Sequence, residues 1–535
     1  MSTPATFENP VIPGFYPDPS ICRVGDRFYL VTSSFEYFPG IPIFTSTDLV
    51  AWTPLGHVLT RQSQLDLTAA PASGGIFAPT IRHHAGRFYV TGTNVSDRGH
   101  FIVHADDPSG PWSDPLWVNQ NGIDPSLFFD EGNVYFTSNI EPDPSGPHVA
   151  DPHFERGIQQ SLVDLSTGAL LSEPRFIWRG TGGRYPEAPH LFRRGPYYYL
   201  VISEGGTEYG HMATVGRSTS PWGPFEPSPH GPLASHRSIA SPFQAVGHAD
   251  LVTLPNGDWW MVCLGVRPIG QWPRHTLGRE TFLAPVHWTA DGWPLAGERG
   301  VVRAVETRPD LPPAPAQPYP ERDDFDAAVL RPEWTFVRRP LPSESLHARP
   351  GWLTLSPETA GPADRFPCFV GRRQQHYDFV AQTRLVLDAH DGDEAGIAVR
   401  MNEAHFYALC VRRSGASLEA VLRTRLGRLD LTSVVGLVDG PDVVLGVEGS
   451  PDSYVFTVSD GSGRAVRTQP LDAKFLSTEF AGGFTGVFVG MYAGTPTAGS
   501  AGTASFDWFD YRPAPAAAAQ QQPGHDESSR VAAVN

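Results

Sequence analysis

The sequence has few cysteines, no long apolar stretch and no excess of basic residues. Its four cysteines are scattered over 535 residues without a CxxC pair, which argues against a zinc site or a disulfide framework and favours free thiols. No segment is apolar over the roughly 20 residues that a membrane-spanning helix needs. The beginning, MSTPATFENPVIPGFYPDPS, shows no basic segment followed by an apolar run. These absences predict a cytoplasmic protein without a membrane partner.

Acidic residues outnumber basic ones, 57 to 40, and give a formal net charge of -17. Nucleic acids and anionic membranes bind basic faces, so this balance offers no general reason to bind either. We therefore expect no nucleic-acid partner, and a neutral small molecule fits the charge better.

Glycine and proline are abundant, with 54 and 53 residues spread along the chain. Such spacing is typical of many tight turns between short strands, and it predicts an all-β protein. A chain of 535 residues is also too long for one hydrophobic core, so at least two domains are expected.

A short unit occurs five times in the first three hundred residues. Each copy starts with a polar or small residue, passes a turn glycine seven to nine residues later and continues into an aromatic strand such as FYLVTSS or WWMVCLG. The copies begin at Asp18, Ala78, Asp124, Glu187 and His248. Each unit predicts a β-hairpin, and the blocks STDLVAWTPLG, ADDPSGPWSDPLW and STSPWGPFEPSP are interpreted as outer strands.

The repeat predicts a five-bladed β-propeller over residues 8–305. A sandwich with accidental internal similarity is the competing interpretation, and the regular spacing makes it the weaker one. In a propeller the innermost strands border one central channel, so equivalent repeat positions meet around the axis. Three carboxylates and one imidazole would then converge. An Asp before Pro often only opens a turn, but three converging acids repel one another and indicate a functional site.

Converging carboxylates suit the cleavage of a glycosidic bond. One acid protonates the leaving oxygen and a second carboxylate acts from the opposite face, while a third can raise the pKa of the acid by repulsion. Phe35, Phe77, Trp178 and Tyr185 lie in or near these segments and offer flat apolar faces to a sugar ring. For any one of these aromatic residues, packing in the blade core is the competing interpretation.

Several motifs resemble family 43 of the glycoside hydrolases, in particular its β-xylosidases. They are NPVIPGFYPDPSICRVGDRFYLVTSSFEYFPGIPIFTSTDLVAW, GGIFAPTIRHH, GIDPSLFFD, YPEAPHLF, VGHADLV and LGRETFLAPVHW, and the resemblance extends to about residue 510. It implies a five-bladed propeller and an inverting mechanism. It also implies that Asp18 is the general base, Glu187 the general acid, and Asp124 the residue that tunes and orients the acid.

The resemblance implies further binding residues. Arg279 in LGRETF matches an arginine at the sugar subsite, although an arginine in a turn is usually a solvated surface group. His248 matches an axial histidine near which some members hold a structural calcium ion. No metal ligand is assigned and no cofactor is expected to be required for catalysis. Phe35, Phe77 and His248 complete the expected substrate-binding set on the propeller.

A proline-rich segment, residues 306–322, is expected to be a stiff linker between two domains. The alternating pattern over residues 323–513 predicts a β-sandwich, and residues 514–535 are expected to form a disordered tail. Phe484 in GGFTGVFVG is the candidate for reaching the pocket rim from the sandwich, with core packing as its competing interpretation.

The leading functional hypothesis is an inverting, exo-acting β-xylosidase that releases xylose from xylo-oligosaccharides, with α-L-arabinofuranosidase side activity. An α-L-arabinofuranosidase or an endo-acting relative is the alternative. A sugar-binding propeller without catalysis would not need three axial acids. Assembly into a homo-oligomer is left open.

Overall fold

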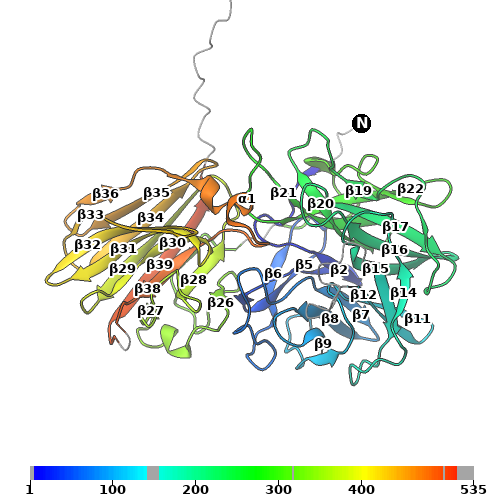
Figure 1. Ribbon diagram of the computed structural model, residues 1–535, viewed down its shortest axis with the longest axis horizontal. Coiled ribbons are helices and arrows are strands. Elements are labelled where there is room, and N and C mark those ends of the chain that lie inside the picture. The colour runs from blue at the N-terminus through cyan, green and yellow to red at the C-terminus, as the bar shows by residue number, and fades with distance from the viewer. Residues whose placement is uncertain (1–4, 141–155, 316–318, 498–499, 515–535) are drawn as a thin grey trace, which may run out of the picture.

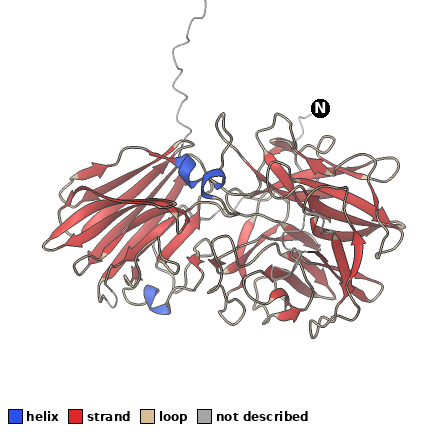
Figure 2. Cartoon of the chain, in the orientation of Figure 1, coloured by secondary structure: helices blue, strands red, loops and turns tan. Residues whose placement is uncertain are grey.

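The computed structural model describes residues 5–140, 156–315, 319–497 and 500–514, which form two β domains side by side (Figure 1). Strands make up nearly all of the regular structure (Figure 2). Over the described residues, helix is confined to two short 3₁₀ turns and the four-residue α1 (Thr478–Ala481). None of these helices is long and apolar enough to cross a membrane. The predicted all-β class is confirmed.

Five antiparallel sheets of four or five strands dominate the N-terminal domain, and the strands of each sheet lie close together in the sequence. Their strands are β2 (Ser20–Val24), β3 (Arg27–Val31), β5 (Gly40–Ser46) and β6 (Thr53–Leu59); β7 (Thr80–His84), β8 (Arg87–Asn94), β9 (Gly99–Ala105) and β10 (Leu116–Val118); β11 (Ser126–Asp130), β12 (Asn133–Asn139), β13 (Ile158–Leu162) and β14 (Arg175–Trp178); β15 (Glu187–Arg194), β16 (Tyr197–Glu204), β17 (Met212–Ser218), β18 (Glu226–Pro227) and β19 (Ala234–Ser235); and β20 (Gln244–Thr253), β21 (Trp259–Val266), β22 (Glu280–Trp288) and β23 (Pro294–Ala296).

The first strands of these sheets lie next to one another in a closed ring. β2 contacts β7, β7 contacts β11, β11 contacts β15, β15 contacts β20, and β20 returns to β2. A ring of sheets with their first strands innermost is a β-propeller, and its blades are the five sheets. The fivefold repeat in the sequence corresponds to the inner hairpin of each blade.

The interpretation of the intervening blocks as outer strands is wrong for most of their length. In ADDPSGPWSDPLW, β9 ends at Ala105 and β10 begins only at Leu116. In STSPWGPFEPSP, β17 ends at Ser218, and β18 covers just Glu226–Pro227. These blocks are turns between the third and fourth strands, because proline lacks the N–H that a strand must donate to its neighbour.

The propeller ring is held closed by its two chain ends. β1 (Thr6–Glu8) pairs antiparallel with β24 (Val305–Thr307). The side-chain amide of Asn9 donates to the carbonyl of Leu283, in the last blade, at 2.8 Å and to that of Arg303 at 3.0 Å. The start of the chain is therefore fixed to the final blade.

The segment after β24 lies against the first blade. Arg308 forms an ion pair with the buried carboxylate of Asp48 at 2.6 Å, and the backbone N–H of Ala314 donates to the same carboxylate at 2.9 Å. The next strand, β25 (Arg322–Asp323), already belongs to the second domain. The expected tail lies almost entirely outside the described residues.

Two facing antiparallel sheets form the C-terminal β-sandwich, as predicted. One sheet contains β25, β39 (Thr503–Pro513), β29 (Phe379–Asp388), β34 (Asp442–Gly449), β35 (Ser453–Asp460) and β36 (Ala465–Arg467), with β27 (Leu353–Leu355) and β37 (Leu471–Asp472) at its margins. The other contains β28 (Cys368–Arg373), β38 (Phe488–Gly494), β30 (Glu394–Asn402), β31 (His405–Ser414), β32 (Ser417–Leu426) and β33 (Leu429–Val438). Aliphatic and aromatic side chains from both sheets fill the space between them.

The two domains share an apolar core, which we call the seam. Phe15 and Tyr37 of the propeller pack in one buried cluster with Phe488 of the sandwich. The rings of Tyr37 and Phe488 are stacked with their centroids 3.9 Å apart. β26 (Phe336–Val337) pairs with β4 (Tyr37–Phe38), so a strand of the sandwich segment extends the propeller.

All four cysteines are free, and three of them are buried.

Candidate active site

The eight residues assigned catalytic or substrate-binding roles from the sequence all line one pocket at the propeller axis. They are Asp18, Phe35, Phe77, Asp124, Glu187, His248, Arg279 and Phe484, and Ala78, Ile123, Thr207 and His211 complete the lining. The cavity volume is about 100 Å³. Pockets for drug-sized ligands are several times larger, so this space suits one small ring.

Unusual backbone conformations occur where the inner strands begin. Asp18, Asp124 and His248 have φ values of 57°, 55° and 47°, and Ala188, which follows Glu187, has a φ of 54°. This left-handed region is unfavourable for residues other than glycine, and among those residues Asn, Asp and His adopt it most readily. β-Bulges interrupt the pairing of β15 after Glu187 and of β20 on both sides of Gly247. Such features re-aim side chains near functional sites and here direct the repeat positions toward the axis.

The carboxylate of Asp18 is buried and held on both oxygens. Oδ1 accepts a hydrogen bond from Arg279 at 2.6 Å, and Oδ2 accepts one from the hydroxyl of Ser33 at 2.5 Å. Nδ1 of His248 lies 3.6 Å from Oδ1. Burial raises the pKa of Asp18, but Arg279, His248 and the Ser33 hydrogen bond together outweigh it and leave the pKa below its ordinary value. Asp18 is therefore ionised at neutral pH.

The pKa of Asp124 is raised, whereas that of Asp18 is lowered. Burial raises the pKa of Asp124 well above the ordinary value, and repulsion from Glu187 and then Asp18 raises it further. The backbone N–H of Ala188 donates to Asp124 and connects it to the peptide that follows Glu187. The Asp124–Glu187 pair thus retains a proton above the usual carboxyl range, because two neighbouring buried carboxylates cannot easily both ionise.

Asp124→Asn is expected to stabilise the fold. The folded protein binds the Asp124 proton more tightly than the unfolded chain does, so stability falls as pH rises through the folded-state pKa. Asparagine keeps the shape, tolerates the left-handed backbone and removes this penalty. We expect a gain of roughly 0.5–2 kcal/mol at pH 7 that disappears below about pH 4. Thermal unfolding midpoints measured across pH check this, and an equal or lower midpoint for the variant at pH 7 would contradict it.

Three phenylalanines form an aromatic wall on one side of the pocket. The ring of Phe35 lies 5.0 Å from Phe77 and 6.2 Å from Phe484, which comes from the sandwich. The guanidinium of Arg279 lies over Phe35 and Phe484 and donates to the carbonyl of Phe484 at 3.4 Å. The backbone N–H of Phe484 donates to Ser73 at 2.9 Å, so its loop is anchored on the propeller.

The loop of Phe484 approaches the propeller backbone very closely. A Cβ on Gly486 would lie only 2.7 Å from the carbonyl oxygen of Leu277, two residues before Arg279. Glycine is needed here because any side chain would push the two loops apart.

The other two aromatic residues considered from the sequence are not in the lining: Trp178 is buried in a blade core, and Tyr185 lies partly exposed outside the pocket.

The surroundings of His248 do not fit a calcium ion. Calcium takes six to eight oxygen ligands, whereas the nearest carboxylate, Asp18, already accepts from Arg279 and Ser33. Two residues further along β20, both oxygens of Asp250 accept from the guanidinium of Arg82, at 2.8 and 3.2 Å. Within the described ranges, no group of three or more His, Cys, Asp or Glu side chains is arranged to hold a metal. Arginine side chains supply the positive charge at this axis.

Sequence reasoning missed three polar residues of the site. Ser33 hydrogen-bonds to Asp18, and Thr207 accepts from Arg279 at 3.2 Å. His211 is almost fully buried, its Nδ1 bonds to the carbonyl of Ala245 at 3.0 Å, and burial lowers its pKa to about 3. Thr207 and His211 follow the glycine pair in EGGTEYGH, directly after an inner hairpin, and that position was the available signal.

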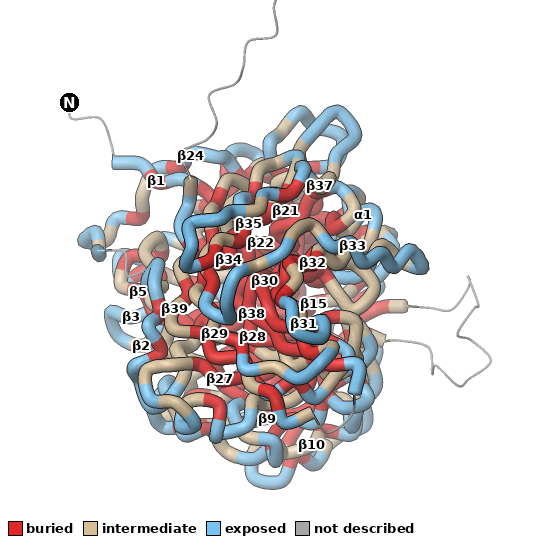
Figure 3. The backbone as a smooth tube through the Cα atoms, turned by 90° about the vertical axis from the view of Figure 1, so that its left-hand side faces the viewer, coloured by how far each residue is buried: buried red, intermediate tan, exposed pale blue. Residues whose placement is uncertain are grey.

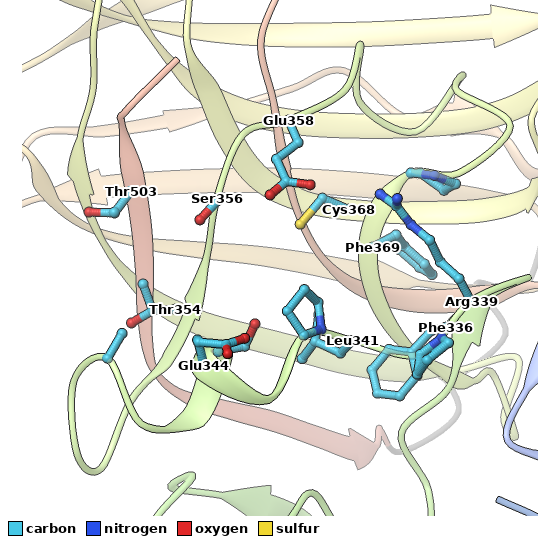
Figure 4. Close-up of a pocket in the computed structure, with 15 residues that line it drawn as sticks. Phe336, Arg339, Leu341, Glu344, Thr354, Ser356, Glu358, Cys368, Phe369 and Thr503 are labelled. Atoms are coloured by element: carbon cyan, nitrogen blue, oxygen red, sulfur yellow. The ribbon is translucent and has the colours of Figure 1, made fainter. Parts of the chain in front are cut away.

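A larger hollow lies in the sandwich and lacks comparable chemistry. Its volume is about 320 Å³, and Figure 4 shows Glu344 and Glu358 on different sides of it. Both carboxylates are solvent-exposed. Burial raises the pKa of the Cys368 thiol in its wall to about 12, so this thiol is not a nucleophile at neutral pH. The hollow has no counterpart to the converging acids of the axial pocket.

A propeller with three carboxylates and an aromatic wall at its axis defines a site of the glycoside hydrolase class. The sequence profile of glycosyl hydrolases family 43 matches residues 7–294, and that of the β-xylosidase C-terminal concanavalin A-like domain matches residues 322–512. The chain belongs to glycosyl hydrolase family 43, in its two-domain form.

Characterised relatives cover nearly the whole chain. A non-reducing end α-L-arabinofuranosidase from Bacteroides ovatus is 43% identical over 95% of both sequences, and a β-xylosidase from Bacillus subtilis is 33% identical over 94% of this chain and 99% of its own. The crystal structure of a xylan β-1,4-xylosidase from Bacillus halodurans superposes with a TM-score of 0.87 at 33% identity, covering 95% of this chain and all of that one.

Proposed function

We propose that the protein is an exo-acting β-xylosidase that releases xylose from the non-reducing ends of xylo-oligosaccharides, with α-L-arabinofuranosidase side activity. The observation that carries this proposal is the small axial pocket, which Phe484 of the second domain walls on one side. A cavity of about 100 Å³ favours binding of one terminal sugar over binding of a continuous chain. An endo-acting enzyme would need an open groove.

Asp18 is proposed as the general base. Its carboxylate is ionised, and the hydrogen bonds from Arg279 and Ser33 fix its orientation. In this role it removes a proton from the water that attacks the anomeric carbon, which inverts the configuration there.

Glu187 is proposed as the general acid that protonates the departing oxygen. Asp124 raises the proton affinity of the pair by repulsion and is connected to the next peptide through Ala188. Arg279 neutralises Asp18 and presents its remaining donors to the pocket, where they can bind sugar hydroxyl groups.

The second candidate is an enzyme that acts mainly on α-L-arabinofuranosides. It is favoured by the 43% identity to the arabinofuranosidase from Bacteroides ovatus, which exceeds the identity to the β-xylosidase from Bacillus subtilis. The terminal xylosyl and arabinofuranosyl groups present similar hydroxyl patterns, so one small pocket can accept both.

The proposal is tested with nitrophenyl β-xyloside, α-L-arabinofuranoside and β-glucoside, assayed in parallel on the full chain. We expect kcat/KM to be highest on the xyloside, lower but measurable on the arabinofuranoside and lowest on the glucoside. Proton NMR of fresh xylobiose hydrolysate should show α-xylose first. A preference for the arabinofuranoside would establish the second candidate, and initial β-xylose would contradict inversion and the role of Asp18.

The pH dependence of kcat/KM tests the proposed role of Asp124. Without the neighbouring carboxylate, Glu187 should release its proton more easily, so the basic limb of the profile of Asp124→Asn should move to lower pH. The acidic limb, which reports ionisation of Asp18, should move much less. Asp66→Asn, which changes a solvent-exposed carboxylate outside the pocket, is the control. A basic limb at the same pH as in the unmodified protein would contradict the proposal that Asp124 controls the protonation of Glu187.

A further inference from the structure

Phe484, which walls one side of the pocket, stands on a loop that packing alone does not hold. Its side chain is 43% exposed. The chain is exposed from Gly482 to Phe484 and becomes buried from Thr485 into β38, the buried strand that follows (Figure 3). The backbone N–H of Phe484 donates to the Ser73 hydroxyl at 2.9 Å, and its carbonyl accepts from Arg279 at 3.4 Å. Ser73 supplies the shorter of these two bonds.

Ser73 itself has an unfavourable backbone conformation. Its φ is 61°, in the left-handed region that a residue with a Cβ adopts at a cost. Its hydroxyl also fits tightly against the loop, because a Cβ on Gly483 would collide with the Ser73 oxygen. Such a conformation persists only where the surroundings impose it, and it is commonest at functional sites. Ser73 does not line the pocket, so its role there is indirect.

The side chain of Glu36 holds Ser73 from the other side. Its Oε2 accepts a hydrogen bond from the backbone N–H of Ser73 at 3.0 Å. Glu36 is fully buried, and Ser73 is the only other residue within the described ranges that donates to its carboxylate. In the sequence it lies between Phe35 of the aromatic wall and Tyr37 of the seam. Glu36 is therefore placed to connect the wall with the domain contact.

A carboxylate at this position is costly for the fold. Burial raises the pKa of Glu36 to about 7, although its own backbone N–H, Arg338 and Arg400 lower it. The guanidinium of Arg338 donates to the carbonyl of Ala70 and to Glu403, and not to Glu36. An ionisable side chain that is kept in an unfavourable place and bonded to a strained residue indicates a role beyond packing.

We propose that Glu36 is a positioning residue that, through Ser73, holds Phe484 against the terminal sugar of the substrate. This inference rests on the proposed function, in which Phe484 walls the sugar-binding pocket. The segments that carry Glu36 and Ser73 are joined directly, because Phe35 and Ile76 exchange backbone hydrogen bonds at 2.9 and 3.1 Å. One buried carboxylate thus ties the Phe484 loop of the sandwich to the segment that carries Phe35.

Ser73→Gly separates positioning from stability in the full chain. Glycine adopts the left-handed conformation freely, so relief of strain offsets the lost hydrogen bond and the unfolding midpoint should change little. KM on the aryl glycoside that the protein hydrolyses fastest should nonetheless rise about fivefold, with kcat changed less than about twofold, because the wall contacts the sugar before and during bond cleavage. A lower midpoint with an unchanged KM would show a purely structural role and overturn the proposal.

Substitutions of Glu36 test the first link. Glu36→Leu removes the acceptor and should raise KM as Ser73→Gly does, whereas Glu36→Gln keeps a neutral acceptor for the Ser73 N–H and should restore most of the affinity. Glu333→Leu is the matched control, since this carboxyl is also buried with a raised pKa but lies outside the pocket, and KM should stay unchanged. An equal rise of KM in Glu36→Leu and Glu36→Gln would overturn the role of the bond to Ser73.

A double-mutant cycle with Phe484→Ala tests the second link. Ser73→Gly should have no further effect on KM in that background, because the loop then carries no ring to position. A full additional rise would overturn the proposal, since Ser73 would then act on the pocket by another route. An unchanged KM in Phe484→Ala alone would contradict the pocket wall of the proposed function. A raised KM in Phe484→Ala with an unchanged KM in Ser73→Gly would overturn only this inference.

Discussion

Asp18→Ala is expected to abolish hydrolysis of both xylobiose and nitrophenyl xyloside, whereas Glu187→Ala should distinguish sharply between them. A general acid contributes roughly 10²- to 10⁴-fold, and its loss matters most when the departing oxygen is a basic sugar alkoxide. Nitrophenolate departs without a proton. Glu187→Ala should therefore lose most activity on xylobiose and retain much of the bond-cleavage rate on the aryl substrate, while the attacking water still needs Asp18 in every case.

Asp18→Asn and Glu187→Gln serve as matched variants, because they preserve the shape of each side chain while removing the ionisable group. Initial rates on both substrates, with the circular dichroism spectrum and unfolding midpoint of each variant, complete the comparison. The reverse ranking, with Asp18→Ala sensitive to the leaving group and Glu187→Ala indifferent to it, would exchange the two proposed roles.

Removal of the sandwich domain is expected to be almost as damaging. Deleting the chain from Glu321 onward uncovers the propeller half of the seam, including Phe15, Phe35 and Tyr37. Exposing one of these buried rings to water costs roughly 1.5–3 kcal/mol of folding free energy. The deletion also removes the Phe484 wall. We expect an aggregating protein whose soluble fraction has at least about 10²-fold lower kcat/KM, even on aryl xylosides.

Phe484→Ala in the full chain distinguishes the contribution of the sandwich to the pocket wall from its contribution to stability. The seam stays intact in this variant, so its unfolding midpoint should change little while kcat/KM on small substrates falls about tenfold. A soluble isolated propeller with full activity on nitrophenyl xyloside would show that the second domain is a detachable module and that Phe484 has no part in the pocket.

The propeller was predictable because its repeat is local. Each inner hairpin carries its own alternation and turn glycine within about fifteen residues, so the five units match one another in the sequence. The outer strands were not predictable, since they are short and follow proline-rich turns such as that between Ala105 and Leu116. Each outer strand pairs with the third strand of its own blade, and no local sequence pattern marks which residues form that pairing.

The composition of the axial pocket followed from the same repeat, since equivalent positions of a ring share one depth. Ser33, Thr207 and His211 could not be found in this way, because none of them occupies the repeated position: Ser33 hydrogen-bonds to Asp18, and Thr207 and His211 line the pocket. The placement of Phe484 depends on how the two domains pack.

The pairing of β1 with β24, and of β4 with β26, constrains the order in which the chain can fold during synthesis. Residues 6–8 cannot pair until residues 305–307 have been synthesised, and residues 37–38 cannot pair until residues 336–337 have been synthesised. The first blade therefore leaves the ribosome with an unpaired N-terminal strand and an uncovered apolar face, and both remain so until the second domain has begun to emerge. Contacts this distant in sequence form slowly and leave apolar surface available to other molecules. Expression yield should consequently depend on chaperone supply far more than the stability of the finished protein would indicate.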